Sequence, residues 1–355
     1  KMRILGISCM FHDASVSVIE DGNILFAGHS ERYSREKNDA YLNQRLVNEA
    51  LTWGKPDVIV LHESSKLKKR RRLSQWSWSS IKSAFTEPTA EDWIKKFYPQ
   101  LAGIPITNCL HHQSHAAAGM LTVPEDWNDA AIVTIDAIGE KQTATISTWQ
   151  KNERIMLRHE VNFPNSLGLF YSAVTSAVGL KPMEDEYILM GMAAYGEPKY
   201  KVKMDLHLFD HPADELHNCL KTIDMSKGLP KSFFNNIDVE DEQTQFDLAA
   251  SAQAVVEERI LSYCRLAFKY SGGSRNLVYM GGVALNCVAN SLIYEKDIFK
   301  NIWIMPNPGD AGSSLGAAAL YYFEATGNFV NWEGPYLGTN IKGQWPTQKF
   351  LESLR

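Results

Sequence analysis

RILGISCMFHDASVSVIEDGNILFAGHSER, residues 3–32, carries the strongest fold signal in the chain. It contains three successive strand-like runs, at residues 3–9, 14–22 and 23–32. Apolar and polar residues alternate in the second run, and an Asp21-Gly22 turn joins it directly to the third. The opening therefore predicts three consecutive strands, followed by a helix over residues 42–51 and a short apolar strand at PDVIVLHE, residues 56–63.

The same pattern returns near residue 130. Strand-like runs occur at AAIVTIDAIGE (130–140), TATISTWQKN (143–152) and RIMLRHEVNF (154–163). Helices are expected over 167–178 and 246–270, and strand-loop-helix units at 276–293 and 301–327. A repeated strand-turn-strand-strand opening indicates an internal duplication. The sequence predicts an α/β fold of two related lobes, residues 1–125 and 126–330, with a ligand cleft between them and a tail at 331–355.

Composition is that of an ordinary globular protein, with 45% hydrophobic and 22% charged residues. A net charge of −5 gives no global reason to expect a polyanionic partner. The five cysteines are odd in number and lack CxxC spacing, which favours reduced thiols over a disulfide framework. Neither a signal-peptide pattern nor an apolar run of membrane-spanning length occurs, so a cytoplasmic protein without a membrane segment is expected.

Two histidines and two aspartates are candidate metal ligands. His111 and His115 stand four residues apart in HHQSHAAAG, which places both imidazoles on one face of a helix. Such pairs also occur as packing residues, and His112 occupies the position where a zincin has its glutamate. Asp136 ends an apolar strand, and Asp310 follows a proline-glycine turn. Two imidazoles and two carboxylates suit Fe, Mn or Zn.

Two glycine-rich turns between strand and helix resemble phosphate-binding loops. Gly281-Gly282 and Gly309–Gly312 would let backbone N–H groups approach a phosphate at a helix N-terminus, although either could be only a tight turn. His12 lies between the first two strands and therefore near the edge of the cleft. A neutral histidine there could accept a proton from an attacking hydroxyl, although a histidine in a turn is often structural.

Nine ordered blocks give the chain a family resemblance. The blocks are FHDASVSVIEDG, ERYSREK, HHQSHAAAG, DAIGE, SLGLFYSAVT, EDEYILMGMAAYG, GGVALN, NPGDAGSSLGAA and GPYLG, within residues 3–338. With these blocks the chain resembles the nodulation-factor and antibiotic O-carbamoyltransferases, whose first domain is related to the tRNA threonylcarbamoyladenosine transferase.

The resemblance implies a duplicated actin/hexokinase-like two-lobed domain that binds a divalent metal, iron in characterised relatives, together with ATP or carbamoyl-adenylate. The donor would be carbamoyl phosphate, and the carbamoyl group would pass to an acceptor hydroxyl. His12 would act as the base. The matching metal positions are His111, His115, Asp136 and Asp310, and the cofactor-binding candidates are Arg35, Lys37, Gly281, Gly282, Asn286, Gly309 and Gly312.

Three departures from the family pattern matter. The adenylate-forming domain that follows in relatives has no counterpart in these residues, so it is expected in cis or in trans as a partner. Ile188 stands where relatives usually have a lysine, which removes one cation from the site. Ala137 replaces the commoner glycine of the DGxGE block. A homodimer is a further partner prediction.

The acceptor has one local sequence signal. SKLKKRRRLSQWSWSS clusters cations with two tryptophans, which suits a phosphate backbone and a stacked base. An acceptor could then be a hydroxymethylated base in DNA; a small molecule or sugar is the alternative, with the cations forming a solvated helix face. The residues concerned are Lys66, Lys68, Lys69, Arg70, Arg71, Arg72, Trp76 and Trp78.

Three other functions share this pattern. A sugar kinase or ATPase of the actin-like superfamily has the same fold, but such enzymes hold Mg²⁺ through carboxylates and water and need no paired histidines. A nucleotide-binding scaffold without activity is compatible with Ile188 and the missing second domain. A tRNA threonylcarbamoyl transferase is disfavoured by SLGLFYSAVT and GPYLG, which match the O-carbamoyltransferase pattern.

Overall fold

The computed structural model describes residues 1–74, 78–209 and 227–339. Within these residues the chain forms two five-stranded sheets, with strand orders β3-β2-β1-β4-β5 and β8-β7-β6-β9-β10. In each sheet the first three strands pair antiparallel and the last two join in parallel. The two sheets therefore repeat one topology, which confirms the predicted duplication and the actin/hexokinase-like α/β class.

The strands lie close to their predicted positions, except that no strand was predicted at β5. The predicted turn at Asp21 joins β2 to β3, with Asp21 and Gly22 both at positive φ. The strands are β1 (Arg3–Ser8), β2 (Ser15–Glu20), β3 (Asn23–His29), β4 (Val58–Leu61), β5 (Ile106–Asn108), β6 (Asp129–Ile135), β7 (Gln142–Gln150), β8 (Met156–Asn162), β9 (Asn276–Met280) and β10 (Asn301–Trp303).

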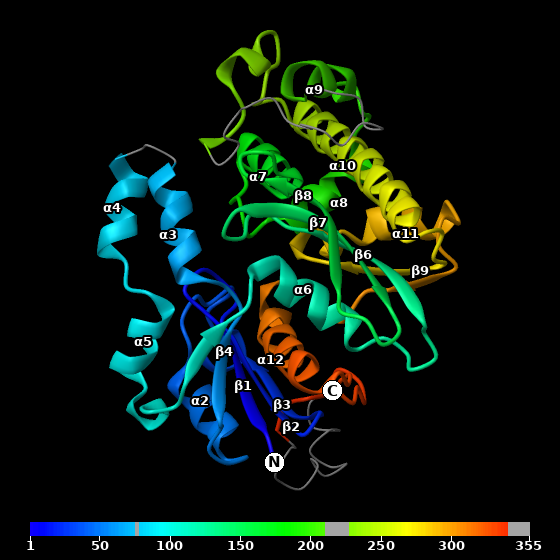
Figure 1. Ribbon diagram of the computed structural model, residues 1–355. Coiled ribbons are helices and arrows are strands. Elements are labelled where there is room, and N and C mark those ends of the chain that lie inside the picture. The colour runs from blue at the N-terminus through cyan, green and yellow to red at the C-terminus, as the bar shows by residue number, and fades with distance from the viewer. Residues whose placement is uncertain (75–77, 210–226, 340–355) are drawn as a thin grey trace, which may run out of the picture.

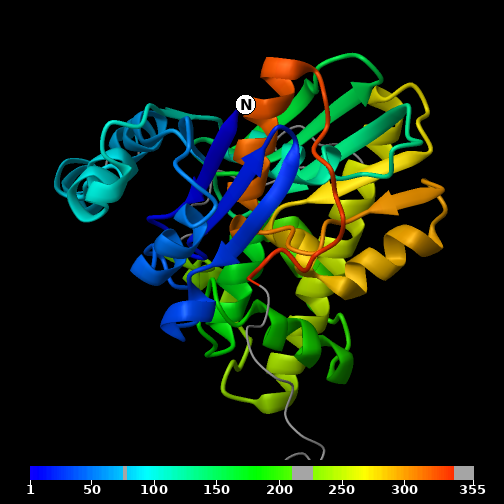
Figure 2. The same ribbon diagram turned by 90° about the horizontal axis from the view of Figure 1, so that it is seen from below.

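Five layers result from how the helices cover the sheets (Figure 1). Helices α6 and α12 lie between the two sheets and share one apolar core with both. Helices α2 and α5 cover the outer face of the first sheet, and α7, α8 and α10 cover the outer face of the second. Figure 2 shows α12 between the sheets from a second direction. Residues far apart in the chain therefore meet in the central layer.

The helices agree with the predicted ones where predictions exist, with ends set by capping. Asn43 and Asp241 cap α2 and α10 by accepting backbone N–H groups from Arg45 and Thr244. The helices are α1 (Glu31–Ser34), α2 (Gln44–Leu51), α3 (Ser65–Ser74), α4 (Trp78–Thr86), α5 (Ala90–Phe97), α6 (His111–Met120), α7 (Leu167–Ala177), α8 (Glu186–Met192), α9 (Lys201–Leu208), α10 (Glu242–Tyr270), α11 (Cys287–Glu295) and α12 (Asp310–Thr326), with short 3₁₀ turns at Pro99–Leu101, Ala193–Tyr195, Lys231–Phe234 and Gly282–Leu285.

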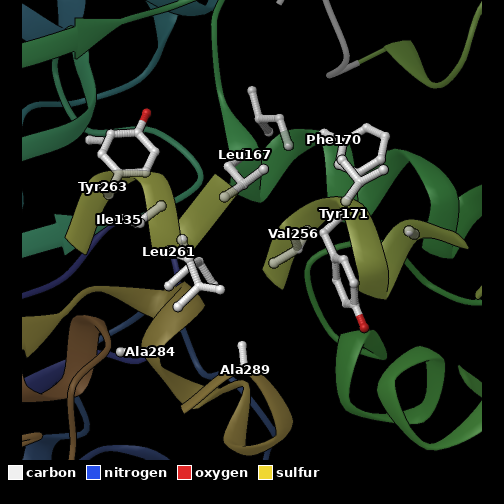
Figure 3. Packing of buried hydrophobic residues seen from close by; sticks show 14 of the residues in the cluster. Ile135, Leu167, Phe170, Tyr171, Val256, Leu261, Tyr263, Ala284 and Ala289 are labelled. Carbon is white, nitrogen blue, oxygen red and sulfur yellow. The ribbon is translucent and has the colours of Figure 1, made fainter. Parts of the chain in front are cut away.

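The outer core of the second lobe anchors one wall of the cleft. Side chains from α7, α10 and α11 converge on the strands there, among them Phe170, Val256, Leu261 and Ala289 (Figure 3). Tyr171 extends from this core, and its hydroxyl donates a hydrogen bond to Gln253 at 2.8 Å. The cleft wall is therefore held by a packed core rather than by loops alone.

Two glycines set the spacing of the central layer. A Cβ on Gly316 of α12 would lie 1.8 Å from the Ser114 carbonyl oxygen of α6, and a Cβ on Gly6 of β1 would lie 1.9 Å from the Ser314 carbonyl oxygen. Real Cβ atoms do not approach that closely. The close passage of α12 between β1 and α6 therefore requires glycine at both positions.

The lobe boundary predicted at residue 125 stays a prediction, and the structure adds one detail to it. Helix α12 belongs to the second lobe by sequence, yet it packs on β1 and β2 of the first sheet. After α12 the chain runs beside β3: Asn331 pairs with Asn23, and Ala27 donates to the Leu337 carbonyl at 2.8 Å. The predicted tail is described only as far as Thr339.

None of the helices in the described ranges is long and apolar enough to cross a bilayer. The cysteines within those ranges, Cys9, Cys109, Cys264 and Cys287, are free thiols. Cys219 and Trp76 lie outside the described residues.

Candidate active site

Four candidate metal ligands converge between the two sheets. His111 and His115 come from the first two turns of α6, Asp136 follows the last residue of β6, and Asp310 begins α12. One ligand atom from each lies within 4.8 Å of the others, and all four side chains are buried. The structure thus brings together residues separated by up to 199 positions, from 111 to 310.

The distances within this cluster fit a single cation. The two Nε2 atoms lie 3.1 Å apart. Nitrogen-to-oxygen distances run from 2.8 Å, for His111 to Asp136, up to 3.5 Å, for His111 to Asp310. Ligands placed about 2.0–2.2 Å from one metal ion lie about 3.0–3.5 Å from one another. The donor set of two imidazoles and two carboxylates therefore fits a first-row divalent ion.

Outer hydrogen bonds hold these ligands in place. Glu140 accepts the His111 backbone N–H at 3.1 Å and the Ser64 backbone N–H at 2.7 Å. Its carboxylate thereby caps the N-terminus of α6, where a negative charge is favoured. The Ser313 hydroxyl lies 3.4 Å from His115 Nδ1, which orients that ring from α12.

Electrostatics couple the histidines to the carboxylates. Burial lowers the pKa of His115, but hydrogen bonds and charge from Asp136 and Asp310 outweigh this and raise it to about 10. Burial raises the pKa of Asp136, but hydrogen bonds from His111 and His115 bring it well below its usual value. Burial also raises the pKa of Asp310, but the charges of His12 and His111 and the hydrogen bond from His115 bring it below its usual value. Both carboxylates therefore stay ionised at neutral pH, as metal ligands require.

His12 lies beside this cluster on the loop between β1 and β2. Its Nδ1 lies 2.8 Å from Asp13 Oδ2, and its Nε2 lies 3.5 Å from Asp310 Oδ2. Burial lowers the pKa of His12, but the charge of Asp310 and the contact with Asp13 raise it to about 9. The predicted position at the cleft edge is where the structure places His12.

A cavity of about 240 Å³ opens beside the cluster, with walls from both lobes. Of the predicted site residues, His12, Asp136, Gly282 and Asn286 line it. Gly282 donates its backbone N–H to Asp136 at 3.2 Å. Gly281 has a φ of 94° and no room for a Cβ against Ile135. The Gly281-Gly282 turn therefore needs glycine for its conformation and for its close approach to the site.

The remaining cofactor candidates lie outside the cavity wall. Gly309 caps α12 just before Asp310, and Gly312 packs against the Asn307 carbonyl. Arg35 is exposed at the end of α1. Lys37 reaches across to the second lobe, where its Nζ lies 3.2 Å from the Glu184 carbonyl and 4.6 Å from the centre of the Tyr187 ring.

Sequence reasoning assigned no role to several residues that shape the cavity. Ser172 donates to Glu186, and Tyr171 donates to Gln253, which also accepts from the predicted residue Asn286. These residues form the polar part of the wall, and most of them stand in the blocks that carry the family resemblance. The apolar part is lined by Met183, Tyr187, Met190, Val256, Val283 and Leu285.

The two substitutions relative to the family pattern lie differently. Ala137 lines the cavity, and Gly168 of α7 packs against it so closely that an added Cβ would lie 2.7 Å from the Ala137 Cα. Ile188 is half-buried on α8 and is not among the lining residues, although Tyr187 and Met190 are.

The basic stretch forms α3, which stands with α4 as an arm on the first lobe (Figures 1 and 2). Lys68 is buried, with its Nζ 2.5 Å from Glu63 and 5.3 Å from the centre of the Phe11 ring. Arg71 donates to the Gly139 carbonyl of the other lobe.

The other cations of α3 differ in their surroundings. Arg72 pairs with Glu87 at 2.5 Å, and Lys69 lies over the Phe85 ring. Lys66 and Arg70 are exposed. Three of the six cations thus bind acidic or carbonyl groups of the protein itself. Trp78 begins α4, and its side chain lies outside the described part of the chain.

Fold and site together define a two-lobed actin/hexokinase-like domain with a buried metal-ligand cluster at its cleft. The family model described as "Carbamoyltransferase N-terminus" matches residues 83–319. The chain therefore belongs to this carbamoyltransferase family, as the resemblance indicated.

Three comparisons place the chain further. An uncharacterised protein of Synechocystis sp. is 34% identical over 89% of this chain and 56% of its own length. The 3'-hydroxymethylcephem-O-carbamoyltransferase of Amycolatopsis lactamdurans is 24% identical over 90% of this chain and 60% of its own length. The chain thus spans little more than half of these relatives. Full-length HypF in its phosphate- and nucleotide-bound form shares the fold, at 15% identity and a TM-score of 0.52, over 94% of this chain and 47% of HypF.

Proposed function

We propose that this chain carries out the transfer half-reaction of an O-carbamoyltransferase. It would move a carbamoyl group from carbamoyl-adenylate, made from carbamoyl phosphate and ATP, to an acceptor hydroxyl. The observation that carries the proposal is the placement of His12 beside the buried cluster of His111, His115, Asp136 and Asp310, on the wall of a cavity that touches that cluster.

The cavity suits an adenylate because its two ends differ in chemistry. Near the cluster it offers His12, the Gly282 turn and two carboxylates. Away from the cluster it is lined by methionine, valine, leucine and tyrosine side chains. A mixed anhydride of carbamate and AMP has a charged phosphate at one end and a flat base at the other, so it matches this polarity.

A divalent cation held by His111, His115, Asp136 and Asp310 would neutralise phosphate charge and polarise the carbamoyl carbonyl. The chain's own groups contribute positioning and proton transfer. Gly282 fixes Asp136 through its backbone N–H. Lys37 and Arg35 stand on the same lobe as His12 and remain candidates for anion contacts.

The proposed step has a simple balance. A cation held by Asp310 would offset the carboxylate charge that raises the pKa of His12, so His12 acts as a neutral ring. The acceptor hydroxyl gives its proton to Nε2 of His12 while its oxygen forms a bond to the carbamoyl carbon. The bond between that carbon and the phosphate oxygen breaks, and AMP leaves with the electron pair. His12 lies with Nε2 toward the cluster and Nδ1 on Asp13, which is the orientation that such a base needs.

The adenylate-forming step belongs to a further domain or partner in this proposal. The matched relatives are much longer than this chain, as the coverage of 56% and 60% shows. That activity would be supplied in cis or in trans.

The acceptor is a hydroxyl of a small molecule or sugar, or of a hydroxymethylated base in DNA. Only part of the α3 cation cluster is available for a phosphate backbone, because Lys68, Arg71 and Arg72 contact groups of the protein. Lys69 is exposed too but lies over the Phe85 ring, which leaves the exposed Lys66 and Arg70 for such contacts. Changing both to glutamine tests the DNA alternative: transfer to hydroxymethylcytosine DNA should fall while transfer to a small acceptor stays constant.

The deciding experiment supplies purified protein with Fe²⁺, Mn²⁺ or Zn²⁺, separately prepared carbamoyl-adenylate, and a panel of hydroxyl acceptors. Mass spectrometry should detect a product 43 mass units heavier than the acceptor, roughly the mass of one carbamoyl group replacing a hydrogen. A parallel reaction with ATP and sugars alone tests a kinase. ATP-dependent phosphorylation of a sugar without any carbamoyl donor would overturn the proposal in favour of that alternative.

A further inference from the structure

One carboxylate outside the metal cluster contacts two imidazoles at once. Asp13 places Oδ2 at 2.8 Å from His12 Nδ1 and Oδ1 at 3.2 Å from His29 Nε2. His29 is the last residue of β3, and it pairs across the sheet with Ser15 of β2. The three residues therefore belong to the β1 to β3 part of the first sheet, with His12 and Asp13 on the loop between β1 and β2, and do not depend on closure of the lobes.

We propose that Asp13 is a positioning residue: it holds the His12 proton on Nδ1 and leaves the lone pair of Nε2 facing the cavity. The inference rests on the proposed function, because it assigns Asp13 a task only if His12 is the base. His29 would steady the second oxygen of the same carboxylate.

Ionisation of Asp13 makes this direction of hydrogen bonding obligatory. Burial raises the pKa of Asp13, but the contacts with His12 and His29 lower it to about 2. An ionised carboxylate only accepts hydrogen bonds. The Nδ1 atom of His12 must therefore be the donor in the 2.8 Å contact.

A second carboxylate competes for the same ring. Asp310 Oδ2 lies 3.5 Å from His12 Nε2, on the cavity side. If Asp13 were neutral, a proton on Nε2 would be favoured there, and the ring would then donate toward Asp310. A ring in that tautomer has no lone pair toward the cavity and cannot accept a proton from the acceptor hydroxyl. The shorter contact with Asp13 selects the competent form.

The backbone around Asp13 is built to hold this contact. Asp13 has a φ of 54°, in the left-handed region that few residues other than glycine, asparagine and aspartate adopt. The next residue, Ala14, donates to the Asp39 carbonyl at 2.7 Å and accepts from Ser30 at 2.7 Å. Hydrogen bonds on both sides of Ala14 thus fix the loop from which Asp13 reaches the two rings.

The test is an Asp13→Asn variant, which keeps the shape of the side chain and removes its charge. Transfer is expected to fall about 10²- to 10⁴-fold in kcat, because loss of the orienting carboxylate lets the ring adopt the wrong tautomer. KM for the donor and metal content should remain at wild-type values. Asp13→Glu should recover part of the rate. Asp39→Asn is the matched control, because it makes the same change nearby at a side chain that accepts the Tyr41 backbone N–H.

A spectroscopic readout separates this inference from the proposed function. Protein labelled with ¹⁵N-histidine, loaded with Zn²⁺, reports the tautomer of His12 through its two ring nitrogen shifts, with His12→Gln used for assignment. Wild-type protein should show the proton on Nδ1, and Asp13→Asn should move it to Nε2.

The outcomes point in different directions. A proton on Nε2 in the wild-type protein, or an unchanged tautomer in Asp13→Asn, would overturn the inference whatever the enzyme does. If the predicted tautomers are observed but no carbamoyl transfer occurs, the proposed function is wrong. Asp13 would then still control the tautomer of His12, but that control would have no role in transfer. Loss of metal from Asp13→Asn would also overturn the inference, since the variant would then act through the cluster.

Discussion

The Nε2 atoms of His111 and His115 lie 3.1 Å apart, and both face the carboxylates of Asp136 and Asp310. Two imidazoles rarely place their ring nitrogens so close unless a cation or a shared proton lies between them. This relationship is the basis of the metal predictions below.

His115→Ala should remove metal from the protein and abolish carbamoyl transfer. One of four ligand atoms is lost, and the variant leaves a gap at a site where all four residues are buried. Metal affinity should fall by more than the roughly 10–100-fold that loss of an outer hydrogen-bond partner costs a metal site. Elemental analysis after dialysis against a known Zn²⁺ concentration measures the effect.

His112→Ala is the matched control for this variant. His112 directly follows His111 in α6 and is also buried, but it is not part of the four-ligand group. It should keep one metal ion per chain. Equal metal retention by both variants would remove the proposed ligand set.

Glu140→Gln should loosen the N-terminus of α6. The Glu140 carboxylate accepts the backbone N–H groups of His111 and Ser64 and is itself buried. Loss of the charge is expected to cost about 1–3 kcal/mol of unfolding free energy, measured by urea denaturation, and to weaken Zn²⁺ binding about tenfold. Glu153→Gln, at an exposed turn, should change neither quantity.

Much of this architecture can be predicted from sequence. The alternation at ASVSVIE and the Asp21-Gly22 turn predict β2 and β3, and the second meander follows by the same pattern. His111 and His115 share a helix face by spacing alone. These features are local: each depends on residues that are close to one another in the sequence, so the sequence pattern alone is enough to predict them.

Long-range relationships are what the sequence conceals. Asp310 reaches His115 only because α12 returns to the first sheet, through contacts at Gly6 and Gly316 that have no local signature. The contact of Asp13 with His29 depends on the register of β2 and β3. The ion pairs of Lys68 with Glu63 and of Arg72 with Glu87 also have no sequence signature. From the sequence alone, this run of cations is therefore predicted to be more exposed than it is.

Metal-free protein should lose stability as the pH rises from 6.5 to 10. The pKa of His115 is 6.5 in an unperturbed chain and about 10 in the folded one, so the folded state holds this proton more tightly. The contribution of this proton to the free energy of unfolding is fully present below pH 6.5 and disappears as the pH passes through 10. His12 acts in the same direction, with a pKa near 9.

The thermal midpoint of metal-free protein at a series of pH values measures this effect, and it should fall steadily across the range. With saturating Zn²⁺ the fall should be smaller, because bound imidazoles are already deprotonated. A midpoint that rises or stays level in metal-free protein between pH 6.5 and 10 contradicts the pairing of the histidines with the carboxylates.

Gly316→Ala should disturb the metal cluster from a distance. The new Cβ would lie 1.8 Å from the Ser114 carbonyl oxygen, so α12 must move away from α6. Asp310 begins α12, and His115 follows Ser114 on α6; the movement therefore separates two ligands whose atoms now lie 3.2 Å apart. We expect a loss of about 1–3 kcal/mol of unfolding free energy, as for other overpacked cores, together with weaker Zn²⁺ binding.

Gly191→Ala on α8 is the matched control. Its new Cβ meets no atom within 4 Å, so the change should be neutral or slightly stabilising, as alanine is in a helix. Wild-type metal affinity in Gly316→Ala would mean that the spacing of α6 and α12 does not set the geometry of the site.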